Sequence, residues 1–317
     1  MWIYVGKRML LLIPTLLGIV TVVFVANRIL PGNPIQLMIP PNMSGSVETA
    51  FVHKLMALYG FNHPLYVQYA DYMWQIAHLN FGNSLQTGLP ILPQVLIHLA
   101  NTAQLGILAV LFSLLIGLPA GIVSAVRRDS WADYGSMVVA LGGVSIPSFV
   151  LGYVLIYVFG LTLGILPPSG FNGPVWTWAG LLYAILPAIT LGAGMAGYVA
   201  RFTRSSMLEV LNADYVRTAH AKGLANGRVI RRHVLRNAWI PILTAVGLQV
   251  GLVLSGAVIV ENVFGWPGIG QYLLNGINNR DFPVVQAAVI FVAAIFVLVN
   301  LLTDLTYVWV DPRIRYD

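Results

Sequence analysis

The chemistry that this sequence offers is concentrated in basic side chains. Eight of its 17 lysines and arginines fall within residues 201–236, between two long apolar runs. Guanidinium and ammonium groups bind carboxylates and phosphates through charge-assisted hydrogen bonds. On charge alone, residues 201–236 are best interpreted as a basic loop that sets membrane orientation and contacts anionic lipid headgroups.

Groups that carry out catalysis are scarce in the chain. It has no cysteine, which excludes a thiolate nucleophile and any cysteine-ligated metal site. Its lysines are Lys7, Lys54 and Lys222, and none completes the Gly-x-x-x-x-Gly-Lys-Ser/Thr phosphate-binding motif. The histidines are scattered without metal-ligand spacing. We expect no enzyme activity, no metal and no cofactor in this chain.

Isolated polar residues interrupt the apolar runs. Such residues are costly in a bilayer and commonly face a solute pathway or a partner helix. The candidates for a pathway are Gln104, Gln249, Glu261, Asn300 and Asp304. Solvation at the membrane interface is the alternative for Glu261 and Asp304, because both lie near the ends of their apolar runs. Glu261 could line an outer vestibule.

The elements that must position these residues are transmembrane helices. The chain is 58% hydrophobic and only 9% charged, with a mean hydropathy of +0.79, which excludes an ordinary soluble domain. The apolar runs are continuous and do not alternate with period two, which favours helices over a barrel. We expect an all-α polytopic membrane protein whose single transmembrane domain covers residues 1–317. Its six spans are predicted at about 9–27, 101–125, 135–161, 178–200, 239–260 and 284–307.

The basic residues also predict the orientation of these spans. With the N-terminus in the cytoplasm, 14 of the 17 lysines and arginines fall on the inner side and three on the outer side. Both termini are then cytoplasmic, residues 31–97 are external, and residues 201–236 form a cytoplasmic loop. A signal peptide is the alternative for the first run, but no cleavage site follows it. The net charge of +6 is thus an orientation signal, and we expect no nucleic-acid partner.

Short helices are predicted in both extramembrane segments. Ser46 is a plausible N-cap for an external amphipathic helix that ends at Gly60. The cytoplasmic loop is expected to hold two helices, over residues 205–222 and 228–237, separated by Gly223 and Asn226-Gly227. Glycines spaced four apart, Gly117 with Gly121 among them, predict close helix packing.

A ten-residue motif lies at the centre of the cytoplasmic loop. It reads Asp214-Tyr215-Val216-Arg217-Thr218-Ala219-His220-Ala221-Lys222-Gly223. It resembles the cytoplasmic loop of ABC importer permeases, in the form typical of the dipeptide/oligopeptide/nickel branch. Further motifs of that branch occur in order along the chain, including Leu30-Pro31-Gly32-Asn33-Pro34, Phe81-Gly82-Asn83-Ser84, Phe264-Gly265-Trp266-Pro267-Gly268 and Arg280-Asp281-Phe282-Pro283. Asn33, Asn80 and His220 depart from the residues that the branch often carries.

The resemblance implies a type I ABC importer permease of the bacterial inner membrane. Its expected partners are a second homologous permease subunit, two cytoplasmic ATPase subunits that bind ATP and Mg, an external solute-binding protein and the lipid bilayer. Residues 213–223 would insert into the ATPase. Arg217 and Lys222 would pair with its acidic groups, Ala219 and Ala221 would allow close approach, and Gly223 would end the helix. The solute would be a peptide or a related small molecule.

A transporter or channel that works without an ATPase is the alternative function. It predicts inverted repeats within the chain, and none is evident in the sequence.

Overall fold

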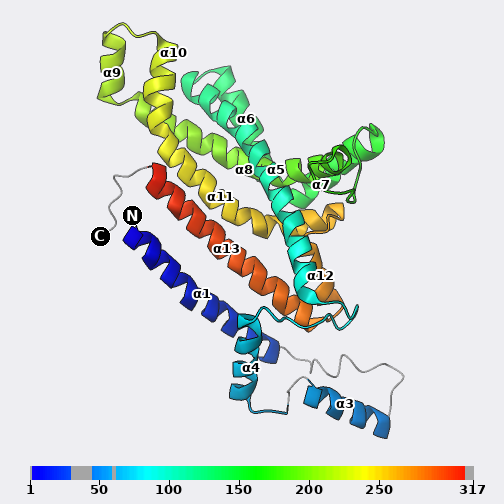
Figure 1. The fold of residues 1–317 in the computed structure, drawn as a ribbon. Helices are drawn as coiled ribbons and strands as arrows, with labels where there is room; N and C mark the ends of the chain where they lie inside the picture. The colour runs from blue at the N-terminus through cyan, green and yellow to red at the C-terminus, as the bar shows by residue number, and fades with distance from the viewer. Residues whose placement is uncertain (1, 30–44, 59–61, 311–317) are drawn as a thin grey trace. The chain divides into compact units, whose positions relative to one another are not determined.

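The computed structural model describes residues 2–29, 45–58 and 62–310, and they form helices joined by turns and loops (Figure 1). Within this described part there is no strand, only an isolated bridge between Asn83 and Pro90. The all-α prediction is confirmed. The chain divides into two compact units. The first is built mainly from Ala100–Gly268, and the second from Gly6–Leu99 and Ile269–Ile295.

Four of the described helices are long and apolar enough to cross a bilayer. These are α1 (Trp2–Ile29), α5 (Ile91–Val126), α8 (Trp178–Leu211) and α13 (Phe282–Val310). The number of candidate spans rises to six if each of two bent helix pairs counts as one. The first pair is α6 (Trp131–Ser145) with α7 (Ser148–Leu155) and the π-helix η1 (Ile156–Thr162). The second is Asn226–Gly251 with Gly256–Phe264, bent by 57° within α11 (Leu235–Phe264). Its first member includes α10 (Asn226–Val229) and the π-helix η2 (Ile230–Val234).

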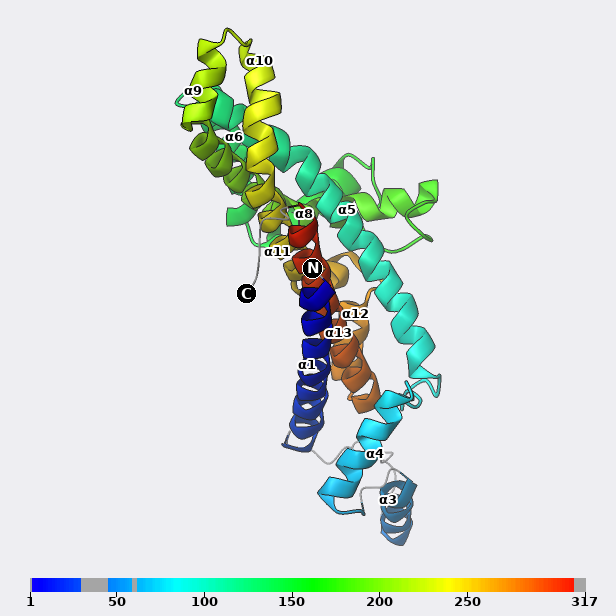
Figure 2. The same ribbon diagram turned by 60° about the vertical axis from the view of Figure 1, so that its left-hand side comes forward.

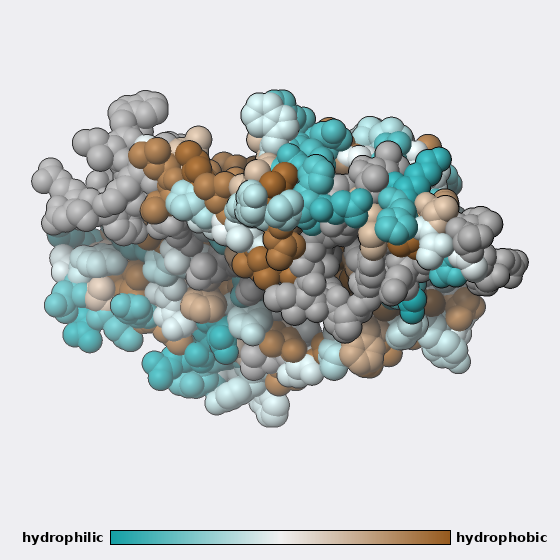
Figure 3. All heavy atoms as spheres, turned by 90° about the horizontal axis from the view of Figure 1, so that it is seen from below, coloured by the Kyte–Doolittle hydropathy of each residue, from teal (hydrophilic) through white to brown (hydrophobic). Residues whose placement is uncertain are grey.

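Large apolar side chains lie on the surface of these helices. Leu10, Leu115 and Val138 keep 68%, 72% and 70% of their area exposed. On the face drawn in Figure 3, hydrophobic residues lie at the surface beside hydrophilic ones. A soluble protein would bury such side chains, whereas lipid tails solvate them. This surface is that of a membrane protein.

The predicted span 135–161 is not one straight helix. Pro147 has no N–H to continue the ladder, and its ring keeps the preceding residue out of the helical region. Ile146 accordingly has φ −89° and ψ 124°, which is extended backbone. Helix α6 ends at Ser145 and α7 starts at Ser148. Pro147 was present in the sequence, so this break could have been anticipated.

Close packing against α8 organises the first unit. A side-chain carbon added to Gly117 would lie 2.7 Å from the carbonyl oxygen of Ala196, and one on Gly121 would lie 2.5 Å from that of Ala200. The two glycines of α5 therefore let its backbone touch α8, as their spacing predicted. The core of this unit combines residues of α5, α8 and α11 with the buried Trp266.

The predicted external segment 31–97 contributes three helical regions. They are α3 (Ser46–Leu58), α4 (Leu65–Ala77) and the start of α5. Helix α3 begins at the predicted N-cap region, whereas Gly60 lies outside the described residues. In the second unit, α4 packs on α1, where the rings of Phe24 and Tyr69 meet edge to face at 5.3 Å.

The remaining element of the second unit is α12 (Ile269–Asn278). Its first residue, Ile269, is buried with Ile91, Val284 and Ala287 in a separate apolar cluster. The clusters of the two units share no residue.

Candidate functional site

The ten-residue motif forms a short amphipathic helix, α9 (Asp214–Ala221), followed by a tight turn. Two residues three positions apart, Val216 and Ala219, are 1% and 5% exposed. They pack in an apolar cluster that includes Met207 of α8 and Val229 and Val234 after the turn. Helix α9 is thus anchored to the first unit by one face. The helix predicted over residues 205–222 is instead two, because α8 ends at Leu211 and Ala213 is extended.

Gly223 ends the motif in a conformation that favours glycine. Its φ is +76°, in the left-handed region. The N–H of Gly223 donates to the carbonyl of His220 at 2.9 Å, and the N–H of Leu224 donates to that of Ala219 at 3.3 Å. This pair of bonds is the Schellman arrangement that satisfies the last carbonyls of a helix. The prediction that Gly223 stops this helix agrees with the geometry.

The opposite face of α9 is open to solvent. Its exposed residues are Asp214, Tyr215, Arg217, Thr218, His220, Ala221 and Lys222. Arg217 and Asp214 approach to 3.9 Å, but their side chains remain 75% and 100% exposed, so each stays available to another partner. The expectation that Ala219 meets a partner is wrong, because Ala219 is buried inside this chain. Ala221 is on the exposed face.

Helices α9 and α10 lie side by side at one end of the first unit in both ribbon views (Figures 1 and 2). The predicted helix over residues 228–237 starts earlier and does not stop. Residues 226–264 are helical through α10, η2 and α11, with a bend of 57° between Gly251 and Gly256. The predicted cytoplasmic loop is therefore a helical hairpin: α9 follows α8 after a break at Asn212 and Ala213, and α10 continues through η2 into α11.

Arg204, in α8 shortly before this hairpin, forms an ion pair with Asp133 that the sequence analysis did not predict. The Arg204 guanidinium donates from Nε to Oδ1 of Asp133 at 2.9 Å and from Nη2 to Oδ2 at 2.8 Å. Asp133 is 2% exposed, and it also accepts hydrogen bonds from the Ser124 hydroxyl and from the Asp129 N–H. These contacts join the ends of α5, α6 and α8. Met207, three residues beyond Arg204 in α8, belongs to the apolar cluster that holds α9. Helix α8 therefore connects the ion pair to α9.

One of the predicted pathway residues lines a cavity. Gln249 of α11 borders a space of about 310 Å³ between α6, α7, α8 and α11. Ser148, Thr190 and Tyr198 bring further hydroxyl groups to the wall of this space. The remaining lining is apolar or glycine, mainly Val144, Leu151, Leu191, Met195, Val253, Gly143 and Gly194.

The other predicted pathway residues lie elsewhere. The side-chain oxygen of Gln104 accepts a hydrogen bond from the Val175 N–H at 3.0 Å, which anchors the loop before α8. Asn300 packs on α11, with its Oδ1 3.1 Å from the position of a side-chain carbon on Gly251. Asp304 is in α13, and its side chain lies outside the described residues.

Glu261 does not line a vestibule, which corrects the expectation. Its side chain is fully buried at 0% exposed, and Oε1 accepts a hydrogen bond from the Thr102 hydroxyl at 2.5 Å. Beside it, the Trp266 ring N–H donates to the Asn101 carbonyl at 3.1 Å. Gly268 lies so close that an added side-chain carbon would be 2.1 Å from Oε1. The Phe264–Gly268 motif therefore covers the Glu261 side chain and keeps it packed against α5.

Two motifs far apart in the sequence meet in the second unit. The Ser84 hydroxyl donates to Oδ2 of Asp281 at 2.6 Å, and the Gln86 N–H donates to the same oxygen at 3.3 Å. Asp281 is 3% exposed. The contact gives Asp281 a structural role, since its carboxylate holds the loop before α5 against the start of α13.

Comparison with known proteins agrees with this architecture. The sequence profile of the family described as "Binding-protein-dependent transport system inner membrane component" matches residues 117–316. The dipeptide transport system permease protein DppB of Alkalihalophilus pseudofirmus is 44% identical over 99% of both chains. The glutathione transport system permease protein GsiC of Escherichia coli K12 is 40% identical over 99% of both chains.

Solved structures show the same fold at low identity. A chain of the inward-facing MetNI methionine ABC transporter superposes with a TM-score of 0.58 at 17% identity, covering 69% of this chain and 96% of that one. A chain of an amino acid ABC transporter gives 0.54 at 18% identity, covering 68% and 93%. The helices, the buried contacts and the full-length relatives together show that this chain is a multi-pass inner-membrane permease and belongs to the family of binding-protein-dependent transport system inner membrane components.

Proposed function

We propose that this chain forms half of the translocation pathway of an ATP-driven peptide importer and couples to its ATPase through α9. The observation that carries the coupling proposal is the division of α9 into two faces. Val216 and Ala219 fix the helix to the first unit, while Arg217, His220 and Lys222 are presented outward. A helix held on one side transmits a displacement applied to the other.

The charge of the exposed face suits an acidic cleft. Arg217 has only an exposed partner at 3.9 Å, and Lys222 has none within the described residues. Water screens such pairs strongly, so exchange for a partner's carboxylate costs little. The ATPase subunits would bind ATP and Mg, because this chain holds no phosphate-binding loop.

The cavity beside Gln249 is the candidate for the solute pathway in this subunit. Peptide groups need hydrogen-bond partners when they leave water. Gln249, Ser148 and Tyr198 offer amide and hydroxyl groups in an otherwise apolar lining. A second homologous permease chain would provide the other half of the pathway wall.

The names of the relatives support a peptide solute. DppB is a dipeptide permease and GsiC a glutathione permease, and both align with nearly the whole of this chain. The proposed assembly contains a second permease, two ATPase subunits and an external solute-binding protein. The termini and the α9 hairpin would face the cytoplasm, in keeping with 14 of 17 basic residues on that side.

Charge reversal at Arg217 tests the coupling. In the reconstituted complex, Arg217→Glu should lower solute uptake and binding-protein-stimulated ATP hydrolysis by at least about tenfold, since like charges across an interface repel. The matched control is Arg127→Glu, a reversal at another exposed arginine outside α9. The control should keep both activities.

Two results would contradict the proposal. One is wild-type uptake by the Arg217→Glu complex at unchanged subunit composition. The other is solute transport by this chain without any ATPase subunit, which would favour the secondary-transporter alternative.

A further inference from the structure

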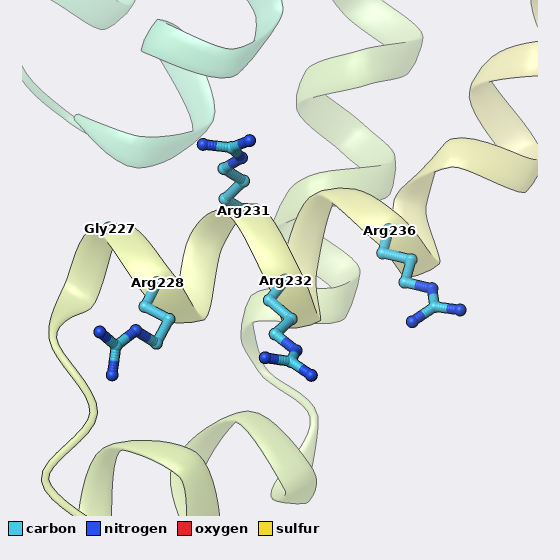
Figure 4. A pocket seen from close by; sticks show the side chains of 5 residues that line it. All are labelled: Gly227, Arg228, Arg231, Arg232 and Arg236. Carbon is cyan, nitrogen blue, oxygen red and sulfur yellow. The ribbon is translucent and has the colours of Figure 1, made fainter.

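Three arginines form a row on the helix that follows the α9 turn. They are Arg228 in α10, Arg232 in η2 and Arg236 in α11. Together with Gly227 and Arg231, they line an open hollow of about 620 Å³. Figure 4 shows Arg228, Arg232 and Arg236 on one side of the helix and the Arg231 guanidinium on the other.

The π-helix aligns this row. An α-helix advances about 100° per residue, so residues eight apart are offset by about 80°. A π-turn takes up one additional residue, which reduces that offset to about 20°. Because η2 covers Ile230–Val234, it lies between Arg228 and Arg236 and brings their side chains to the same face.

The positive charges of the arginine row are not neutralised by carboxylates of the described residues. In the described part of the chain, Arg228, Arg232 and Arg236 form no ion pair, and no carboxylate lines the hollow. Three neighbouring guanidinium groups repel one another, so an anion that bridges them is bound favourably. Each group presents a planar fork of N–H donors that matches the oxygens of a phosphate.

The location of the arginine row indicates which kind of anion it would meet. Arg236 is three residues before Trp239, which is 37% exposed at the start of the apolar run of α11. Tryptophan at such a position marks a membrane–water interface. From there the row extends roughly 12 Å along the helix, at about 1.5 Å per residue. It therefore passes through the layer in which lipid phosphates lie.

We propose that Arg228, Arg232 and Arg236 form a binding site for the phosphate headgroups of an anionic phospholipid. A lipid with two phosphates, such as cardiolipin, matches a row of arginines repeated every four residues. Basic pockets beside transmembrane helices bind such headgroups. The site is distinct from the exposed face of α9, and its function does not depend on the solute that is transported.

The test is native mass spectrometry of the full chain with its co-purifying subunits, titrated with cardiolipin. Phosphatidylethanolamine serves as the zwitterionic comparison. We expect Arg232→Gln/Arg236→Gln to weaken cardiolipin binding by about 25-fold, at about fivefold for each arginine lost. The control Arg127→Gln removes the same charge from an exposed arginine that does not line the hollow, and it should change binding by less than about twofold.

A conservative variant separates geometry from folding. Arg232→Lys/Arg236→Lys keeps both charges and removes the guanidinium forks, so it should bind cardiolipin with an affinity between those of the wild type and the glutamine variant. Inorganic phosphate at millimolar concentration should not displace the lipid. Complete displacement would indicate a site for a free anion and overturn the lipid assignment.

Three other outcomes would overturn the proposal. The glutamine variant could bind cardiolipin as the wild type does, or Arg127→Gln could weaken binding equally. Loss of the ATPase subunits with cardiolipin affinity retained would instead identify the row as a protein contact.

Discussion

The Asp133–Arg204 pair and the Asp214–Arg217 pair use the same two chemical groups in opposite surroundings. The first is bidentate, with contacts of 2.9 and 2.8 Å, and its carboxylate is 2% exposed. The second has a single approach of 3.9 Å between side chains that are 75% and 100% exposed. A buried pair fixes the helices that carry it, because separating it strands a charge. An exposed pair is free to exchange partners, which suits a surface that meets another subunit.

Breaking the buried pair should have the largest effect. Asp133→Asn leaves Arg204 without its anionic partner, and we expect a loss of about 2 kcal/mol in the free energy of unfolding. The value is below that of a fully buried pair because Arg204 keeps 28% of its side chain exposed. Thermal unfolding of the purified protein measures it.

Asp129→Asn is the matched control for this prediction. Asp129, 69% exposed, pairs on the surface with Arg128, 59% exposed. The positive φ of Asp129, 59°, is one that asparagine tolerates. Its stability should change by less than about 0.5 kcal/mol. Equal losses in the two variants would remove the distinction between buried and exposed pairs.

Gly268→Ala tests whether the packing around Glu261 is as rigid as that around Asp133. The new methyl group would lie 2.1 Å from Oε1, and the carboxylate has little freedom to move because Thr102 donates to it. We expect a loss of about 1.5 kcal/mol in the free energy of unfolding, measured by thermal unfolding. Gly135→Ala, where the space is open, should be neutral or stabilising.

Gly223→Ala extends the comparison to the exposed hairpin. The space around Gly223 is open, so the cost comes only from its φ of +76° and should be about 1 kcal/mol. Gly227→Ala is the control, because Gly227 lies within α10 with open space around it. A Gly223→Ala protein as stable as the Gly227→Ala protein would show that the turn can adopt another conformation.

The smallest effect on stability is expected at the exposed pair itself. Asp214→Asn removes the partner of Arg217, and no resolvable change in the unfolding temperature should follow, because water already solvates both groups. A loss comparable with that of Asp133→Asn would mean that α9 is held by this pair and not by Val216 and Ala219.

Local sequence patterns predicted most of the helices, since long apolar runs have few alternatives in a membrane. The turn at Gly223 and the close packing at Gly117 and Gly121 followed from the residue types alone. Ala219 was misplaced because small residues were taken as contact points. Its spacing of three from Val216 is that of a buried face.

Side-chain contacts between residues far apart in the sequence could not be predicted from local patterns. Asp133 and Arg204 are 71 positions apart, as Ser84 and Asp281 are 197 apart, and no local pattern joins them. Both contacts depend on which helices pack together. The same limitation applies to Gln249, which was one of five polar candidates until the packing of α8 and α11 placed it beside a cavity.

Helix α8 has a mechanical consequence. From Ala188 to Leu211 it runs without a proline, about 36 Å at 1.5 Å per residue. Thr190 and Tyr198 on this stretch border the cavity, Arg204 holds Asp133, and Met207 meets the cluster beneath α9. The cavity wall, the ion pair and the cluster beneath α9 are therefore connected by one continuous helix, so a displacement of α9 would reach the cavity through α8.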